Sequence, residues 1–87
     1  MFVIIVYDVQ VERIDAVRTY LKKYLNWMQN SVFEGDLTPS ELVRIKADLS
    51  NITNKNKDCI IIYQIRNKDL LDTQVIGTPK SNPSTII

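Results

Sequence analysis

The chain has 87 residues, a formal net charge of +1 at pH 7, one cysteine and no histidine. This length suits one small domain that buries only roughly 60–65% of its unfolded surface, so an uncovered apolar face favours dimerisation. The absence of histidine excludes Ser-His and Cys-His nucleophilic pairs and His-ligated zinc or copper sites, and the single cysteine excludes an intrachain zinc ribbon.

The first predicted element is a strand at residues 2–7, an unbroken apolar run that is followed by Asp8. The end of such a strand is where small α/β domains place side chains that do chemistry. Without histidine, an enzyme would rely on carboxylates, hydroxyls, lysine or arginine, and carboxylates most naturally hold Mg²⁺ or Mn²⁺. Asp8 is therefore the first candidate residue, for metal-assisted phosphodiester chemistry. The alternative is that Asp8 only leaves the sheet and helps to start the next helix.

The middle of the chain predicts two helices and further strands. Residues 12–25 carry apolar side chains at helical spacing, with acidic residues near the start and lysines near the end, as the helix dipole favours. A second helix begins with Thr38 as its N-cap, proline at the first helical position and Glu41 three residues after the cap. Residues 26–37 predict either one bent strand or two short strands. After the second helix, residues 58–65 form another apolar run that predicts a strand.

The order of these elements is that of a ferredoxin-like α+β sandwich, a βαββαβ unit with both helices on one face of an antiparallel sheet. Residues 2–7 and 59–63 are apolar throughout, whereas strands covered on one face should alternate. A second copy is the obvious cover, so we predict a homodimer with two sheets packed face to face. Residues 73–76 predict an additional short C-terminal strand at the edge of either protomer. We expect one domain at residues 1–77 and a flexible tail at residues 78–87.

We expect a cytoplasmic protein. No stretch approaches the roughly 20 apolar residues of a membrane-spanning helix, so no membrane contact is expected. The apolar N-terminus has neither a basic leader nor a small-residue cleavage site. Cys59 has no partner for an internal disulfide and lies in an apolar run, where a small buried hydrophobe is the expected role.

Several stretches together resemble the Cas-two family, the smaller of the two nearly universal CRISPR adaptation proteins. They are Tyr7-Asp8-Val9, the segment from Trp27 to Gly35, residues 58–63 and Val75-Ile76-Gly77. The similarity covers residues 1–77 in order, and its most specific part is Gln-x-Ser-Val-Phe at residues 29–33. The resemblance implies a ferredoxin-like homodimer in which Asp8 faces its symmetry mate across a cleft and binds Mg²⁺ or Mn²⁺ between the two chains.

Two functions of different classes follow from the resemblance. One is a metal-dependent endonuclease that cuts RNA or DNA, with Asp8 as the catalytic and metal-binding residue. The other is an adaptor in CRISPR spacer acquisition that binds the Cas-one integrase and clamps duplex DNA. A small regulatory ferredoxin-like module that binds a metabolite has little support, because the chain has only two glycines and no glycine-rich loop.

Other candidate residues concern nucleic acid. Arg13, one turn into the first helix, either reaches a phosphate near the cleft or pairs locally. Ser31 matches the family motif and is expected at the cleft. Lys55, Lys57 and Arg66 belong to a stretch with an excess of positive charge, which either grips a duplex backbone by neutralising phosphates or is an ordinary solvated surface.

Four more residues complete the comparison with the family. Tyr7 is expected to pack in the core, because strand alternation points it away from the face of Asp8. Trp27 departs from several family members, which carry a basic residue there, so one candidate phosphate contact is lost. We expect Trp27 either to pack at the dimer interface or to stack on a base. Glu34 and Asp36 are either extra metal ligands or a solvated strand edge.

Overall fold

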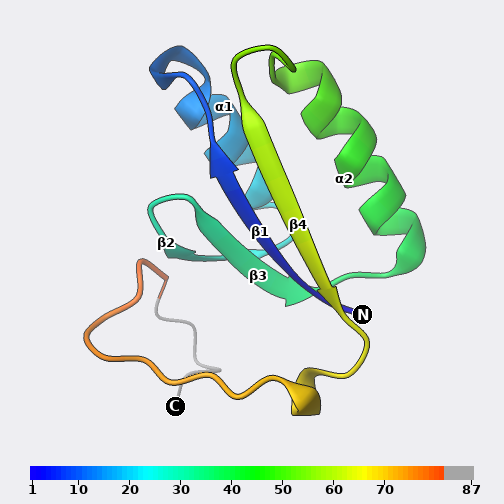
Figure 1. Cartoon of the computed structure of the whole chain (residues 1–87), viewed down its shortest axis with the longest axis vertical. Helices are drawn as coiled ribbons and strands as arrows, with labels where there is room; N and C mark the ends of the chain where they lie inside the picture. The colour runs from blue at the N-terminus through cyan, green and yellow to red at the C-terminus, as the bar shows by residue number, and fades with distance from the viewer. Residues whose placement is uncertain (82–87) are drawn as a thin grey trace.

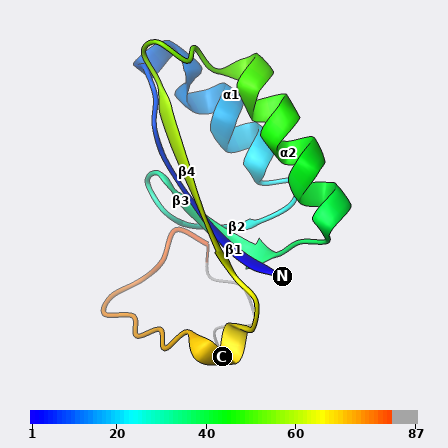
Figure 2. The same ribbon diagram turned by 45° about the vertical axis from the view of Figure 1, so that its right-hand side comes forward.

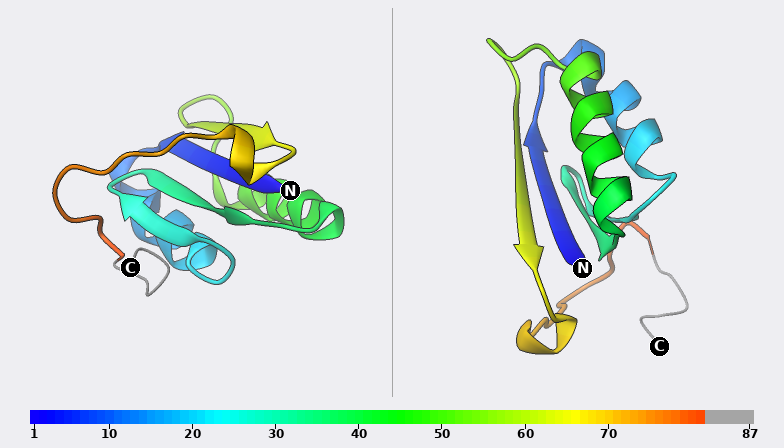
Figure 3. Two further views of the ribbon diagram at one scale, coloured as in Figure 1. Left: turned by 90° about the horizontal axis from the view of Figure 1, so that it is seen from below. Right: turned by 90° about the vertical axis from the view of Figure 1, so that its right-hand side faces the viewer.

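The chain folds as one antiparallel sheet with two helices, and the computed structural model describes residues 1–81 (Figure 1). Its elements are β1 (Phe2–Asp8), α1 (Val11–Leu21), β2 (Asn26–Gln29), β3 (Val32–Asp36), α2 (Pro39–Ile52), β4 (Cys59–Ile65) and a single turn of 3-10 helix, η1 (Lys68–Leu70). The strand order is β2-β3-β1-β4. Both helices pack side by side on the same face of the sheet (Figures 2 and 3). The predicted ferredoxin-like α+β fold is confirmed.

Residues 26–36 form two short strands rather than one bent strand. β2 and β3 pair as a hairpin whose register shifts between Trp27 and Gln29, as in a β-bulge. The turn of the hairpin is held against β1, because the Tyr7 hydroxyl donates to the Asn30 carbonyl at 3.2 Å and the Tyr7 N–H donates to the Ser31 carbonyl at 3.1 Å. The hairpin turn and the carboxyl end of β1 are therefore fixed beside each other.

The hydrophobic core lies between the sheet and the helices. Successive residues of a strand point to opposite faces, and Val3, Ile5 and Tyr7 of β1 are the ones buried under the helices. Tyr7 lies 6.2 Å from Phe33 between ring centroids in a stacked arrangement, so its predicted packing role is confirmed. The helices and their flanking turns complete the core with Val17, Leu21, Leu25, Leu37, Leu42, Ile45 and Leu49.

The opposite face of the sheet is apolar and is not covered by the helices (Figure 3). The register places Ile4 of β1 opposite Tyr63 of β4, and Val6 opposite Ile61. The exposed fraction is 45% for Ile61 and 53% for Tyr63. Patches of this kind mark interaction surfaces in small proteins. We call this surface, formed by Ile4, Val6, Ile61 and Tyr63, the open face.

α1 ends earlier than its periodicity predicts. The helix stops at Leu21 and not at residue 25, because residues 22–25 tighten into turns in which the Lys23 N–H donates to the Tyr20 carbonyl at 3.1 Å. Leu25 keeps its place in the core while the chain turns toward β2. The apolar spacing therefore continues past the point where the helix has ended.

The predicted C-terminal strand is not formed within this chain. Residues 73–76 pair with no strand in the described part of the molecule; after η1 the segment runs below the sheet toward β2 (Figure 1). Pairing with a second copy stays a prediction. Two residues of the predicted tail do bond to the edge of the sheet: Lys80 N–H donates to Met28 at 2.9 Å and Ser81 N–H to Trp27 at 2.7 Å. The rest of the predicted tail, residues 82–87, lies outside the described residues.

Neither α1 nor α2 could cross a membrane. Within residues 1–81, no helix has both the length and the apolar composition that a span requires.

The start of α2 carries the predicted capping box. The Glu41 N–H donates to the Thr38 hydroxyl at 3.1 Å, and the Thr38 N–H donates to the Glu41 carboxylate at 2.8 Å. These reciprocal bonds satisfy two N–H groups that a helix start leaves unpaired, and Pro39 supplies the first helical residue without an N–H of its own.

Thr38→Ala removes half of this capping box, and we expect it to lower the free energy of unfolding by about 1 kcal/mol. Urea denaturation followed by circular dichroism measures the change. Ser50→Ala is the matched control, because the Ser50 hydroxyl donates only to the Lys46 carbonyl in the same helix, and its effect should stay within about 0.5 kcal/mol. Equal losses in the two variants would contradict a specific role of the cap.

Candidate functional site

Asp8 is the last residue of β1 and lies at the end of the sheet where the β1–α1 and α2–β4 connections come together (Figure 1). Its partner across the β1–β4 ladder is Cys59. On the other side of β1 lies the β2–β3 turn, held there by the bond from Tyr7 to Ser31. The fold therefore brings the predicted site residues Asp8 and Ser31 to the same end of the sheet.

The Asp8 carboxylate makes no contact that would stabilise the fold within the described residues. Its side chain is exposed and makes no hydrogen bond or ion pair within residues 1–81. The N-cap of α1 is Gln10, whose side chain makes no capping bond, so Asp8 does not cap this helix. Asp8 shares the open face with Val6, two residues before it. A free carboxylate at the rim of an apolar surface is thus the main chemical feature here.

Asp58 organises the backbone around this position. Its carboxylate accepts from the Gln10 N–H at 2.8 Å, from the Asn54 N–H at 2.8 Å, and from both Nε and Nη2 of Arg13, the latter at 3.0 Å. The Asp58 side chain is 1% exposed and the Arg13 side chain 21%. One carboxylate therefore joins the start of α1 to the loop between α2 and β4.

The hydrogen bond with Arg13 perturbs the titration of both partners. It holds the pKa of Asp58 well below its ordinary value, against the opposing effect of burial, and the Asn54 and Gln10 N–H groups lower that pKa further. The same bond raises the pKa of Arg13 above its ordinary value. Arg13 is thus paired with a carboxylate of its own chain, and its predicted contact with a phosphate stays a prediction.

The basic residues predicted to bind nucleic acid fall into two places. Lys55 and Lys57 are exposed in the α2–β4 loop, at the Asp8 end of the sheet. Arg66 follows the other end of β4, which at about 3.3 Å per residue lies roughly 20 Å away. The structure therefore groups Lys55 and Lys57 with Asp8, Ser31 and Arg13, and it separates Arg66 from them.

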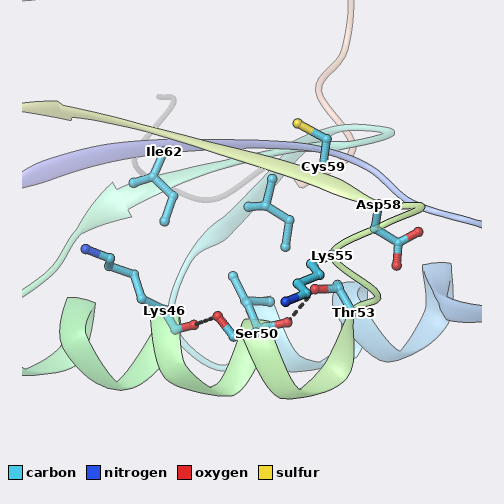
Figure 4. Close-up of a pocket in the computed structure, with 9 residues that line it drawn as sticks. Lys46, Ser50, Thr53, Lys55, Asp58, Cys59 and Ile62 are labelled. Atoms are coloured by element: carbon cyan, nitrogen blue, oxygen red, sulfur yellow. Dashed lines mark hydrogen bonds between the residues drawn. The ribbon is translucent and has the colours of Figure 1, made fainter.

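A cavity of about 550 Å³ lies between α2 and β4 (Figure 4). Its rim carries the ammonium groups of Lys46 and Lys55, and its floor is apolar, with Ile60 and Ile62 of β4. The Cys59 side chain points away from α2 toward the open face. The exposed position of Cys59 corrects the sequence prediction of a buried hydrophobe, because the helices cover only the other face of β4.

One chain alone does not supply a complete metal site. No group of three or more carboxylates and cysteines suited to a metal ion occurs in residues 1–81. Glu34 pairs with Ile4 and Asp36 with Phe2, so both lie along β1 away from Asp8. A cation at Asp8 would need its further ligands from water or from a second chain.

The model of the family described as CRISPR associated protein Cas2 matches residues 1–73. The chain belongs to the Cas2 family. The match agrees with the resemblance of the sequence motifs around Asp8 and residues 29–33.

Curated relatives and solved structures match all or most of the chain. A curated protein of Methanosarcina acetivorans, named CRISPR-associated endoribonuclease Cas2, is 48% identical over 87 residues. The alignment covers 100% of this chain and 100% of that protein. A solved structure described as the crystal structure of cas2 has a TM-score of 0.83 at 44% identity, covering 100% of this chain and 98% of that one. The crystal structure of Streptococcus pyogenes Cas2 at pH 6.5 has a TM-score of 0.73 at 34% identity. The match covers 86% of this chain and 100% of that one.

Asp58 is the site residue that sequence reasoning missed. No local pattern links it to Arg13, which lies 45 positions earlier. The available signal was an acidic residue directly before an apolar strand, at the same end of the sheet as Asp8. That position is equally typical of a solvated turn.

Asp58→Asn removes the buried carboxylate that pairs with the partly buried Arg13 guanidinium and leaves it the exposed Glu12 at 3.7 Å, so we expect a lower midpoint of thermal unfolding at pH 7. The folded-state pKa of Asp58 lies below the unfolded value, so its contribution is present above about pH 4 and is lost as the pH falls further. The difference between parent and variant should therefore shrink between about pH 4 and pH 2. Asp72→Asn, at an exposed carboxylate, is the control. A difference that stays constant down to pH 2 would contradict this role.

Proposed function

We propose that two copies of this chain form a homodimer that acts in CRISPR spacer acquisition and cleaves phosphodiester bonds with a metal held between the two Asp8 carboxylates. The observation that carries the proposal is the position of Asp8, free and exposed at the rim of the open face. The curated relatives from Methanosarcina acetivorans and Pyrococcus furiosus are named CRISPR-associated endoribonuclease Cas2, which supports a nuclease activity.

The open face supports the homodimer. Ile61 and Tyr63 expose large apolar side chains, and burying them against a second copy would remove that area from water. A two-fold contact places the same surface of both chains together. Asp8 shares this surface, so a two-fold axis near the end of β1 brings both carboxylates to one place. Sheet packing and the metal site thus have one geometric origin.

The donor set fits a hard divalent cation. Mg²⁺ is usually held by one or two carboxylates and keeps several waters, which two copies of Asp8 can provide. When bound, Mg²⁺ or Mn²⁺ supplies an activated water and stabilises charge on the phosphate that is attacked. Asp8 holds the cation at the surface. The bonds of Asp58 keep the backbone after Asp8 in place through Gln10.

Lys55 and Lys57 support binding of nucleic acid at the same end of the sheet. Exposed lysines neutralise phosphates without reading the base sequence, which suits a clamp on duplex DNA or on single-stranded RNA. Ser31 and the guanidinium of Arg13 extend this surface. Arg66 would contact a nucleic acid only if the ligand passes along β4 to its other end.

A second candidate function is that of a purely structural adaptor without nuclease activity, which binds duplex DNA and the Cas-one integrase. The observation in its favour is that each chain brings a single free carboxylate to the site within the described residues. A dimer would then hold a metal through two protein ligands only. Both candidate functions require the homodimer and the basic surface. They differ in whether Asp8 takes part in cleavage.

Asp8→Asn removes the charge and keeps the shape, so we expect metal-dependent cleavage to fall on the order of 100-fold or more while the dimer persists. Cleavage of RNA and DNA is measured with Mg²⁺ or Mn²⁺, and light scattering gives the mass of parent and variant. Glu34→Gln, on the same sheet but away from Asp8, is the control. A folded monomeric parent would contradict the dimer. Undiminished cleavage by the variant would remove Asp8 from the site, and retained duplex and integrase binding without cleavage by either protein would favour the adaptor.

Replacing Lys55 and Lys57 together by glutamine should weaken duplex binding. The slope of log affinity against log salt concentration should become shallower by about 1.8 units for each protomer that touches the duplex, at about 0.9 per lost phosphate contact. Fluorescence anisotropy of a labelled duplex at several salt concentrations gives both quantities. Arg66→Gln tests the far end of β4 separately. An unchanged slope in the double variant would exclude this loop from the DNA path.

A further inference from the structure

Three cations surround the indole ring of Trp27. The guanidinium carbon of Arg18 lies 4.5 Å from the ring centroid, and the ammonium nitrogens of Lys22 and Lys80 lie at 4.6 Å and 5.7 Å. Arg18 and Lys22 are four positions apart, so they project from the same side of α1 and its C-terminal turn. We call Arg18, Lys22, Trp27 and Lys80 the Trp27 cluster.

The third cation is held in place by main-chain bonds. The Lys80 N–H donates to the Met28 carbonyl at 2.9 Å and the Ser81 N–H donates to the Trp27 carbonyl at 2.7 Å, both along the free edge of β2. These bonds fix the Lys80 backbone beside the strand that carries Trp27. Residues from three parts of the chain, 18–22, 27–28 and 80–81, therefore converge on one ring.

The Trp27 cluster is short of negative charge. Asp15, 3.8 Å from Arg18 and with a side chain 96% exposed, is the one carboxylate within 4 Å of its cations in residues 1–81. Like charges four positions apart on a helix destabilise it. Nε of Arg18 is buried and has no hydrogen-bond partner among the described residues. Attraction to the indole offsets part of this repulsion, and with one exposed carboxylate against three cations the Trp27 cluster keeps an excess of positive charge.

Trp27 is itself fully engaged. Its ring is nearly parallel to that of Phe33, with an angle of 15° and 6.4 Å between centroids, and its indole N–H donates to the Asn30 carbonyl at 3.2 Å. Trp27 lies opposite Phe33 in the ladder, on the helix-covered face, and thus away from the open face. Within this chain the indole therefore packs on Phe33 and positions cations, and its predicted roles at the dimer interface or on a base stay predictions.

We infer that the Trp27 cluster is a second nucleic-acid contact, which binds backbone phosphates through Arg18, Lys22 and Lys80. The inference rests on the proposed function and adds a surface to it, because β2 lies at the opposite edge of the sheet from β4 and its lysine-bearing loop. A phosphate group offers several acceptor oxygens, which suit the planar fork of a guanidinium together with two flexible ammonium groups. The chain carries a net charge of only +1, so this local excess reflects segregation of charge rather than a basic composition.

The first test compares two double variants of equal charge. Lys22→Gln with Lys80→Gln removes two cations from the Trp27 cluster, whereas Lys23→Gln with Lys68→Gln removes two exposed lysines that lie over Tyr20 and Phe2 instead. Anisotropy of a labelled DNA duplex is measured at several salt concentrations. The first variant should lose several-fold in affinity and about 1.8 units of salt slope for each protomer in contact, and the control should match the parent. Equal slopes in the two double variants would overturn the inference.

The second test reads the cluster directly, because Trp27 is the sole tryptophan of the chain. Saturating duplex should change Trp27 emission in the parent and in the Lys55→Gln, Lys57→Gln variant, as the cations shift from indole to phosphate. An emission that stays constant while anisotropy reports full binding would overturn the inference and leave the proposed function intact. A parent that binds no duplex by anisotropy would overturn both. A response to poly-glutamate but not to duplex would assign the cluster to an acidic protein and overturn the nucleic-acid contact.

Discussion

The carboxylate of Asp58 is the constraint on which the end of the sheet depends. A buried charge is stable only with a full set of donors, and Asp58 has two backbone N–H groups and the fork of Arg13. These donors belong to the residues after β1, to α1 and to the α2–β4 loop. Lys55 and Lys57 lie between the donor Asn54 and Asp58 itself, so their backbone is held by the same carboxylate. The backbone next to the candidate metal ligand Asp8 and the backbone of the candidate phosphate contacts Lys55 and Lys57 are thereby positioned by the same carboxylate.

The second determinant is that both helices cover the same face of the sheet. The core needs only alternate residues of β1 and β4, yet the remaining positions are apolar as well. The sequence thus encodes two surfaces with one set of strands, of which a single chain buries only one. Asp8 follows the alternation onto the exposed surface, whereas Tyr7 points into the core. A core aromatic and a candidate metal-binding carboxylate are therefore adjacent in the sequence.

Local signals were sufficient for most of the fold and for the position of Asp8 at the end of β1, and insufficient where partners lie far apart in the sequence. The capping box of Thr38 and Glu41 is complete within four residues, so it could be predicted in full. The Arg13–Asp58 pair spans 45 positions, and neither residue stands in a pattern that points to the other. Leu25 kept the helical spacing although the helix had ended, because burial follows the core and not the helix. Arg66 is close to Lys55 in the sequence, but β4 lies between them and places them at opposite ends of the strand.

The docking of Lys80 and Ser81 on β2 makes the two edges of the sheet unequal. Unpaired edge strands are templates for the addition of further strands and, when both edges of a sheet are available, for open-ended aggregation. Two main-chain bonds occupy the short β2 edge, while β4 keeps its outer edge unpaired in the described residues. A sheet with one blocked edge can pair with a second sheet through its other edge, but it cannot build an open-ended series of paired sheets. The same segment that completes the cation cluster therefore limits strand exchange to closed, finite assemblies.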